Sequence, residues 1–493
     1  RPQPRGSTPM SAFSALRWLV LPCVALCDPA PAEVTAKSAV VAKAPTTRGH
    51  TGPLPGGLVT TVKHIFGARV IVHEIRGHGT EGPGIRPISG VPRWGVTLKH
   101  GCTGDDLKAI RAHLPNGSRP IFEGRPSQGG LCFFELEGTE HHVRELLRRR
   151  RHRWPSRPTV ESVFEWSTLP VSALPVDATR ATKLGARPST SSQLDPPSWG
   201  LDRIDARSGL DQVFSPANGL GGSGVHVYMA DSGIRTTHED FGGRAIPTLE
   251  VLGNGVVACL PSDTACASDQ NGHGTHTAGT VGGSAYGVAK DVTLHAVQVL
   301  GGSGGGAWSW FVAAIDWIVV NGQRPAVISA SLGGVGPIHS VTVAVDAAVS
   351  AGVTVVVAAG NSGDSPWPDA CLYTPSGVHS AITVGSTNQS DYRSVWSNIG
   401  SCVDLFAPGS DIVSAWASSD TAQMVISGTS MACPHVAGAA ALLLQEDPSR
   451  TPAQVNEALA GRATSGALTD VGEGSPNRLV YVGAADAGPA SRP

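Results

Sequence analysis

The chain has few charged residues, and their charges nearly cancel. Only 15% of its 493 residues are Asp, Glu, Lys or Arg, 41% are hydrophobic, and the formal net charge is −2. This balance is typical of a globular protein, and the length allows a large core and more than one domain. Without a basic excess, nothing indicates binding to nucleic acid through bulk charge. The basic run LRRRRHR at residues 147–153 is a local exception that a solvated, protease-sensitive surface explains.

Apolar runs long enough to span a membrane are also lacking. The run WLVLPCVALC at residues 18–27 is too short, but it follows Arg17 and ends in the small-residue pattern Ala25-Leu26-Cys27. We therefore expect residues 1–27 to be an N-terminal extension with a secretory signal; the alternative is a disordered terminus with a chance apolar patch. Residues 28–92 are rich in Ala, Pro, Gly and Thr and predict a low-complexity linker, in which Val70-Ile71-Val72 is a candidate strand.

None of the nine cysteines stands in a CxxC pair. In a secreted protein, two disulfides and one free thiol are a reasonable interpretation of the five in the C-terminal part. Spacing alone does not decide the connectivity of Cys259, Cys266, Cys371, Cys402 and Cys433.

Residues 93–167 predict a small α+β module. Two helical patterns, at 103–114 and 140–150, alternate with three strand patterns, GVTLK, GLCFFEL and PTVESVFEW. Residues 168–197 lack periodicity and predict a linker that is open to cleavage.

From Trp199 onward, apolar strands alternate with helices, which predicts a parallel α/β sheet. Active sites of such sheets gather at the carboxyl ends of the strands. Asp231 ends one strand, and Asn361 follows another through Gly360. The expected strands are 225–230, 292–300, 326–330 and 353–359, and the expected helices begin at His273, Trp308 and His339.

Ser430 precedes an apolar helical run, so its hydroxyl is expected near the positive end of a helix, with Pro434 in the first turn. A serine nucleophile needs an imidazole that takes its proton and a carboxylate that orients the imidazole. His273 and Asp231 are the candidates, and the Asn361 amide is a candidate donor to an oxyanion.

Each of these residues also has a structural interpretation, as a helix cap, a turn residue or a core histidine. His273 and His276 have HxxH spacing, but the Glu of a zinc-protease helix is missing. Ser430 stands in GTSMA and not in GxSxG, which disfavours an α/β-hydrolase.

Together, the segments DSGI, NGHGTHTAGT, SLGG, AAGNSG and SGTSMACPHVAG resemble the signature blocks of subtilisin-like serine proteases, in the same order. The proteinase K-like branch is the most similar, through WGLDRI, CLYTP and VDLFAPG. The resemblance implies a three-layer, parallel-sheet peptidase domain at residues 198–485 with a tail at 486–493. It implies that residues 93–167 are a ferredoxin-like inhibitory propeptide, and that the chain cuts itself between Trp166 and Pro197.

The same resemblance assigns further site residues. It implies a disulfide between Cys371 and Cys402. Proximity in the sequence alone suggests a second between Cys259 and Cys266, which would leave Cys433 as a buried free thiol. The resemblance implies a calcium site formed by Asp404 and the carbonyls of His379 and Ala381, for which a solvated surface Asp is the alternative. Peptide substrates would bind along Gly304, Gly305 and Gly306 on one side and Ser331, Leu332 and Gly333 on the other, with Ala358, Ala359 and Gly360 lining an apolar S1 pocket.

The resemblance therefore implies a secreted, autoprocessed serine endopeptidase with broad, apolar-leaning specificity and no catalytic cofactor. Its expected partners are protein or peptide substrates and its own propeptide, and we expect a monomer without stable membrane insertion. The alternative is a subtilase that cuts only itself and then acts as a binding protein.

Overall fold

The computed structural model describes residues 58–65, 67–75, 92–99, 101–150, 158–163, 165–167, 172–174, 192–253 and 255–484. The expected signal segment at 1–27, most of the linker at 168–197 and the tail at 486–493 lie outside the described residues. Two large sheets organise the rest: one in a small domain at residues 58–163, and one in a large domain at residues 192–484.

The small domain has a six-stranded sheet in the order β1-β2-β6-β3-β5-β4. From β3 to β6 the chain follows the βαββαβ order of a ferredoxin-like fold. Two features were not expected: the β1–β2 hairpin, and β4, an edge strand whose Pro120 weakens the strand pattern. The elements are β1 (Leu58–Ile65), β2 (Ala68–Ile75), β3 (Arg93–Thr97), α1 (Gly104–Arg111), β4 (Arg119–Glu123), β5 (Phe133–Glu137), α2 (Glu140–Arg150) and β6 (Thr159–Val163).

Both faces of this sheet are buried. Helix α1 begins in a capping box between Thr103 and Asp106. Its Leu107 and the α2 residue Leu146 pack on one face of the sheet in the core of the small domain. Phe133, on the opposite face, belongs instead to a core that it shares with α5 of the large domain. A disulfide between Cys102 and Cys132, which was not expected, also lies in the small domain.

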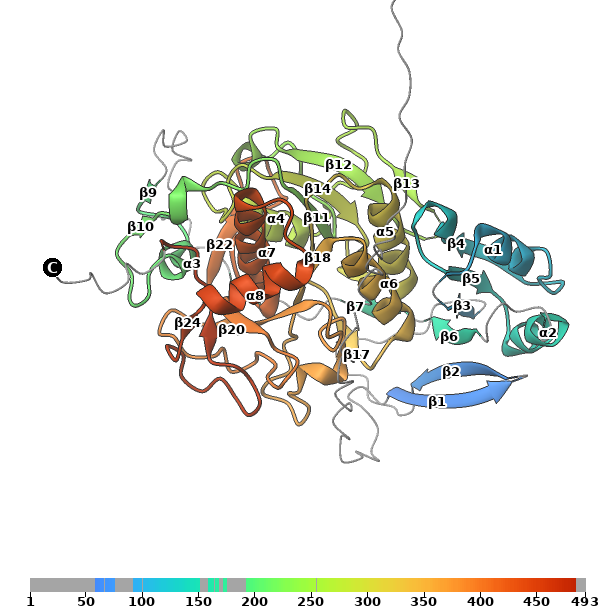
Figure 1. The fold of residues 1–493 in the computed structure, drawn as a ribbon. Coiled ribbons are helices and arrows are strands. Elements are labelled where there is room, and N and C mark those ends of the chain that lie inside the picture. Colours follow the sequence, from blue (N-terminus) through green and yellow to red (C-terminus); the bar gives the residue numbers. More distant parts are fainter. Residues whose placement is uncertain are drawn as a thin grey trace, which may run out of the picture. The chain divides into compact units, whose positions relative to one another are not determined.

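The large domain has a ten-stranded sheet whose neighbours are parallel except at the two outermost pairs, β13–β12 and β25–β24 (Figure 1). The expected strands and helices are present within about two residues. In sheet order the strands are β13 (Val257–Ala258), β12 (Ala245–Glu250), β14 (Thr293–Gln298), β11 (His226–Asp231), β16 (Ala326–Ala330), β18 (Val353–Ala358), β20 (Ile382–Thr387), β21 (Leu405–Pro408), β25 (Arg478–Leu479) and β24 (Thr464–Ser465). The helices are α3 (Trp199–Ile204), α4 (His273–Gly282), α5 (Trp308–Asn321), α6 (His339–Ser350), α7 (Thr429–Glu446) and α8 (Pro452–Arg462).

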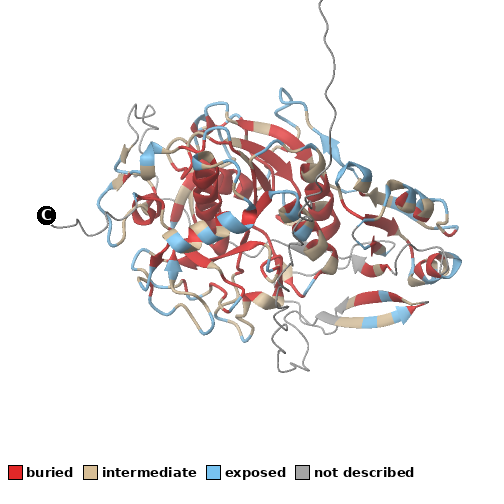
Figure 2. Cartoon of the chain, viewed as in Figure 1, coloured by how far each residue is buried: buried red, intermediate tan, exposed pale blue. Residues whose placement is uncertain are grey.

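Helices on both faces of this sheet make three layers, as expected of an α/β fold. Successive strand residues point to opposite faces. Met229 packs with α4 and α7 in one core, while its neighbour Ala230 packs with α5 and α6 in the other. Helix α7 is buried from Thr429 to Leu444, which explains its mostly apolar sequence (Figure 2).

Candidate active site

Strand β11 and helix α4 bring an acid and an imidazole together. Asp231 is the last residue of β11, and His273 is the first residue of α4. Asp231 Oδ1 lies 2.7 Å from His273 Nδ1 and accepts the Ser232 N–H at 2.7 Å. Both side chains are buried, so water does not compete for this contact.

The surroundings of His273 favour its protonated form. Burial by itself would lower the pKa of the ring, but the charge and hydrogen bond of Asp231, together with the charge of Asp269, hold this pKa above its usual value. The other ring nitrogen, Nε2, is buried and has no hydrogen-bond partner among the described residues. His273 is therefore oriented by Asp231, and Nε2 is left to exchange a proton.

Ser430 is the second residue of helix α7, at the end where the helix dipole is positive. Its Oγ donates to the Ser331 carbonyl at 3.3 Å, and no hydrogen bond joins it to His273 among the described residues. Nucleophile and base are often loosely aligned in the absence of substrate.

The expected position of Pro434 in the first turn is wrong. Helix α7 begins at Thr429, so Pro434 is its sixth residue and lies in the helix interior. A proline there leaves the carbonyl four residues earlier, that of Ser430, without its helical N–H partner. Ser331 Oγ replaces that partner, donating to the Ser430 carbonyl at 2.8 Å. The proline thereby ties the turn that carries Ser430 to Ser331.

Asn361 follows strand β18 and contacts the start of α7. Its Oδ1 accepts from the backbone N–H of Thr429 at 2.9 Å and from Thr429 Oγ1 at 2.7 Å. Because its oxygen is held in this way, the amide presents its Nδ2 as a donor. The preceding Gly360 has φ +107°, a left-handed conformation that favours glycine, and its N–H donates to Thr429 Oγ1 at 3.1 Å.

The expected substrate edges lie beside these groups. Gly305 and Gly306 belong to β15 (Gly305–Ala307), which pairs antiparallel with β7 (Glu165–Ser167). The segment Ser331–Gly333 follows β16 directly, and it contributes the Ser331 contacts to Ser430. Ala358 and Ala359 are buried at the end of β18, and Gly304 precedes β15 with φ +80°.

Residues 222–483 match the subtilase family, Peptidase_S8. The chain belongs to this family. It is 51% identical over 287 residues to an extracellular serine proteinase of Thermus sp. (strain Rt41A), covering 58% of this chain and 66% of that protein. It is 49% identical over 284 residues to alkaline serine exoprotease A of Vibrio alginolyticus, covering 57% of this chain and 50% of that protein. The match therefore spans less than two thirds of either relative.

A solved structure shows the same fold. The crystal structure of a cold adapted subtilisin-like serine proteinase matches with a TM-score of 0.53 and 47% identity, over 58% of this chain and 98% of that one. In the part of this subtilase that the structure describes, every helix is too short or too polar to cross a membrane.

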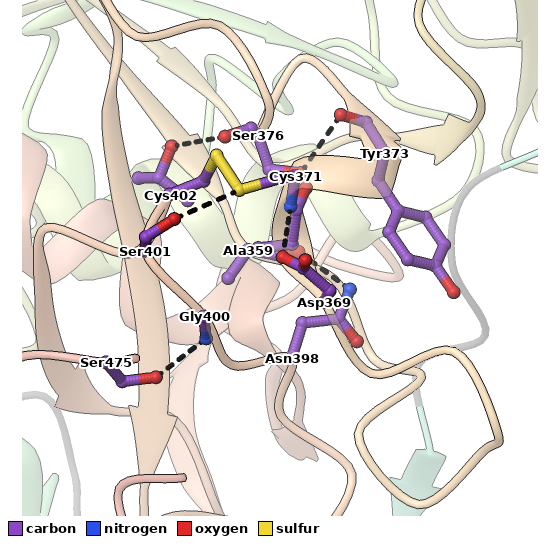
Figure 3. The surroundings of a disulfide bond; sticks show 12 residues. Ala359, Asp369, Cys371, Tyr373, Ser376, Asn398, Gly400, Ser401, Cys402 and Ser475 are labelled. Atoms are coloured by element: carbon purple, nitrogen blue, oxygen red, sulfur yellow. Dashed lines mark hydrogen bonds between the residues drawn. A yellow bond between two sulfur atoms is a disulfide. The ribbon is translucent and has the colours of Figure 1, made fainter. Parts of the chain in front are cut away.

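The subtilase contains both expected disulfides, Cys259–Cys266 and Cys371–Cys402. Figure 3 shows the second disulfide together with Asn398, whose Nδ2 donates to the Ala359 carbonyl at 2.9 Å. Cys433 is a buried free thiol whose Sγ lies 3.5 Å from the Val356 carbonyl, and burial raises the pKa of this thiol to about 12.

Asp404 lies just before β21 and is only partly satisfied. Its Oδ2 accepts the Thr383 N–H at 2.8 Å, while its Oδ1 has a long 3.5 Å contact with Asn456 Nδ2. Burial raises the pKa of this carboxyl, which the Thr383 and Asn456 contacts oppose. The described residues contain no group of three or more His, Cys, Asp or Glu side chains that could hold a metal. A calcium site of one carboxylate and backbone carbonyls does not need such a group of side chains. Asp404 Oδ1, with only a long contact, has room to bind a cation at such a site.

Sequence reasoning missed two residues that support the site. Asp269 receives hydrogen bonds from both sides of the Asp231–His273 pair. Its position at the start of the turn DQNGH, where an Asp side chain often accepts the N–H two residues on, is a signal that could have pointed to it. Asn398 contacts the segment around Asn361, but no pattern in WSNIG indicates this.

Proposed function

We propose that this subtilase is a secreted serine endopeptidase, made as a self-cleaving zymogen, that acts through Asp231, His273 and Ser430. The observation that carries the proposal is the buried 2.7 Å contact between Asp231 and His273. This pair lies at the carboxyl ends of the central strands, where Ser430 and Asn361 also lie. The extracellular relative supports secretion.

In the proposed reaction, Ser430 Oγ attacks the substrate carbonyl while His273 Nε2 takes its proton. Asp231 stabilises the imidazolium that forms. Asn361 Nδ2 and the Ser430 N–H, which lies among the unpaired donors of the first turn of α7, would stabilise the oxyanion. His273 then passes the proton to the leaving amine, and a water molecule hydrolyses the acyl-enzyme by the same steps.

Strand pairing on both sides of residues 168–171 supports the zymogen proposal. Strand β7 pairs with β15, an expected substrate edge, and β8 (Ser172–Leu174) pairs with β23 (Gln423–Ser427), which leads directly into α7. A peptide substrate bound as an added strand would use such edges. We therefore place the self-cleaved bond between Ser167 and Ser172, within the broader interval from Trp166 to Pro197.

The specificity proposed for the S1 pocket rests on its walls. Ala358 and Ala359 are small, apolar and buried, and Gly360 adds no side chain. These walls suit aliphatic or aromatic side chains, and main-chain pairing along β15 gives broad acceptance of the other residues.

A structural calcium ion at Asp404, with the carbonyls of His379 and Ala381, remains part of the proposal. Calcium would be held by hard oxygen ligands and would stabilise the fold without entering the reaction. EGTA should lower the melting temperature of the wild type, whereas Asp404→Asn should lower it without EGTA and abolish the effect of the chelator. Equal responses to EGTA in the two proteins would place the calcium elsewhere.

The main test expresses the wild type and Ser430→Ala, followed by N-terminal sequencing and a peptide-anilide assay. The wild type should start between residues 168 and 172 and turn over substrate, and Ser430→Ala should do neither, because loss of a triad serine removes a factor of about 10⁶ in kcat. A wild type that is processed but never cleaves added substrate would support the binding-protein alternative.

A further inference from the structure

We propose that Asp269 is a positioning residue for hydrolysis: its carboxylate clamps the segment that carries Asp231 to the segment that carries His273. The inference rests on the proposed function, since it concerns the same acid and base.

The Asp269 carboxylate is buried and accepts hydrogen bonds on both oxygens. Oδ1 accepts from Ser232 Oγ at 2.8 Å, from the Asn271 N–H at 2.9 Å and from the Gly272 N–H at 2.8 Å. Oδ2 accepts from the Thr275 N–H at 2.8 Å and from Thr275 Oγ1 at 2.6 Å. So many donors fix the position of the carboxylate.

These donors belong to two separate segments. Ser232 directly follows Asp231, and its Oγ also accepts the Gly274 N–H at 3.0 Å. The other donors flank His273 in the turn before α4 and in its first turn. Asp269 and Ser232 together therefore link the end of β11 to the start of α4, and the contact between Asp231 and His273 depends on this link.

The clamp also carries a charge. The titratable groups that face His273 are Asp231 on β11, Asp269 in the preceding turn and His276 on α4. The two carboxylates raise the pKa of His273, whereas burial lowers the pKa of His276 to about 3, so His276 stays neutral. A second fixed negative charge favours the imidazolium that forms as Ser430 is deprotonated.

An ordinary helix cap would affect stability alone, so the test must read out catalysis. The test compares Asp269→Asn, Ser232→Ala and the control Asp346→Asn, which removes an exposed carboxylate from α6, in the full chain allowed to process itself. The assay measures kcat and KM for a peptide anilide across pH. Asp269→Asn should lower kcat roughly ten- to a hundred-fold, because small misplacements of reacting groups are costly, and should move the acid limb of kcat/KM to lower pH.

Ser232→Ala keeps the charge but breaks the link, so it should lower kcat without moving the acid limb. Asp346→Asn should match the wild type in both measurements. If Asp269→Asn and Ser232→Ala lose only thermal stability, with kcat and the acid limb unchanged, Asp269 is a structural cap and the inference is overturned.

A second measurement covers a variant that folds but does not process itself. In the Ser430→Ala chain, proton NMR follows the downfield Nδ1–H signal of His273 during a pH titration. Adding Asp269→Asn should lower the titration midpoint, and an unchanged midpoint overturns the inference. Should Asp269→Asn not fold, an unchanged kcat in Ser232→Ala has the same consequence. The proposed function fails separately, if wild type and Ser430→Ala have the same activity.

Discussion

Two glutamates on the sheet of the small domain show what a buried carboxylate requires. Glu135 on β5 and Glu161 on β6 both lie opposite Gly95 of β3, so they share a face of the sheet, and their exposed fractions are 1% and 2%. Their pKa values nevertheless shift in opposite directions: the pKa of Glu135 is raised to about 7, and that of Glu161 is lowered.

The difference lies in the donors that each carboxylate meets. Glu161 reaches the N-terminus of α6, where it accepts from the His339 N–H, the Ser340 N–H and Ser340 Oγ, each at 3.0 Å, and it also contacts His73 Nε2 at 3.0 Å. Burial alone would raise the pKa of Glu161, but these contacts outweigh it. For Glu135, burial outweighs the opposing charge of Arg93, which lies 3.9 Å away, and a contact with Ser309, and Oε1 has no hydrogen-bond partner among the described residues.

Asp269, in the large domain, resembles Glu161 in its donors, because each carboxylate accepts from backbone N–H groups at the start of a helix. Donors at a helix N-terminus, and not exposure, thus separate a stabilising buried carboxylate from a costly one.

The largest expected effect comes from removing the satisfied carboxylate. In the Ser430→Ala chain, which we expect not to cut itself, Glu161→Ala should lower the unfolding free energy by about 3–5 kcal/mol, because it removes the acceptor of the buried donors at the start of α6 and the partner of His73 Nε2. The midpoint of urea unfolding measures this. Glu457→Ala, on the exposed face of α8, is the matched control and should change little. Equal midpoints for the two variants would mean that Glu161 does not hold the small domain on α6.

The poorly satisfied carboxylate of Glu135 should make stability fall as pH rises. The pKa of Glu135 is about 7 in the folded chain and 4.5 for a solvated glutamate, so the folded chain binds this proton more tightly. The loss of stability caused by ionising Glu135 grows from about pH 4.5 to above pH 7 and reaches roughly 3 kcal/mol. Glu161, with a lowered pKa, has the opposite slope and loses its contribution as pH falls.

Urea midpoints of the Ser430→Ala chain with and without Glu135→Gln, at about pH 5 and pH 8, test this sign. The variant should gain stability relative to its parent only at the higher pH. A gain of the same size at both pH values would contradict it.

Asn398, a buried amide with a partner on both its oxygen and its nitrogen, offers an uncharged case for the same comparison. Asn398 Nδ2 donates to the Ala359 carbonyl at 2.9 Å, its Oδ1 accepts the Ser362 N–H at 2.8 Å, and its backbone N–H donates to the Gly360 carbonyl at 2.9 Å. These contacts fix the segment that carries Asn361.

Asn398→Ala should therefore lower kcat about tenfold with little change in KM, because Asn361 is proposed to act on the oxyanion and not on the bound substrate. Steady-state kinetics with the peptide anilide measure the split between kcat and KM, and Gln389→Ala, at an exposed position, is the control. A rise in KM alone would show that Asn398 supports only the pocket wall.

The sequence predicted those parts of the structure that depend on neighbouring residues. The strands that end at Asp231 and Ala358 and the helix that begins at His273 follow from local apolar patterns. The order of the signature blocks then indicated that Asp231, His273 and Ser430 would lie together at the carboxyl ends of the strands.

Contacts between distant segments were not predictable in this way. Glu161 and Ser340 are 179 positions apart, and only the register of three strands around Gly95 places Glu161 and Glu135 on one face. The position of Pro434 was misjudged for a related reason: the start of α7 depends on the contact between Thr429 and Asn361, which are 68 positions apart.

The smallest effect is expected for a buried group that stays neutral. Burial raises the pKa of the Cys433 thiol to about 12, as burial raises that of Glu135, but a protonated thiol is uncharged and costs little to bury. Cys433→Ala should change kcat/KM by less than about threefold, and alkylation of the folded wild type should be slow, because the thiolate is the reactive form. Cys433 is three residues from Ser430, and its Sγ lies against the Val356 carbonyl. A mercurial that reaches this Sγ should therefore inactivate the wild type and spare Cys433→Ala. Stoichiometric labelling with full activity would show that this part of the core tolerates a bulky group and that Cys433 does not influence the active site.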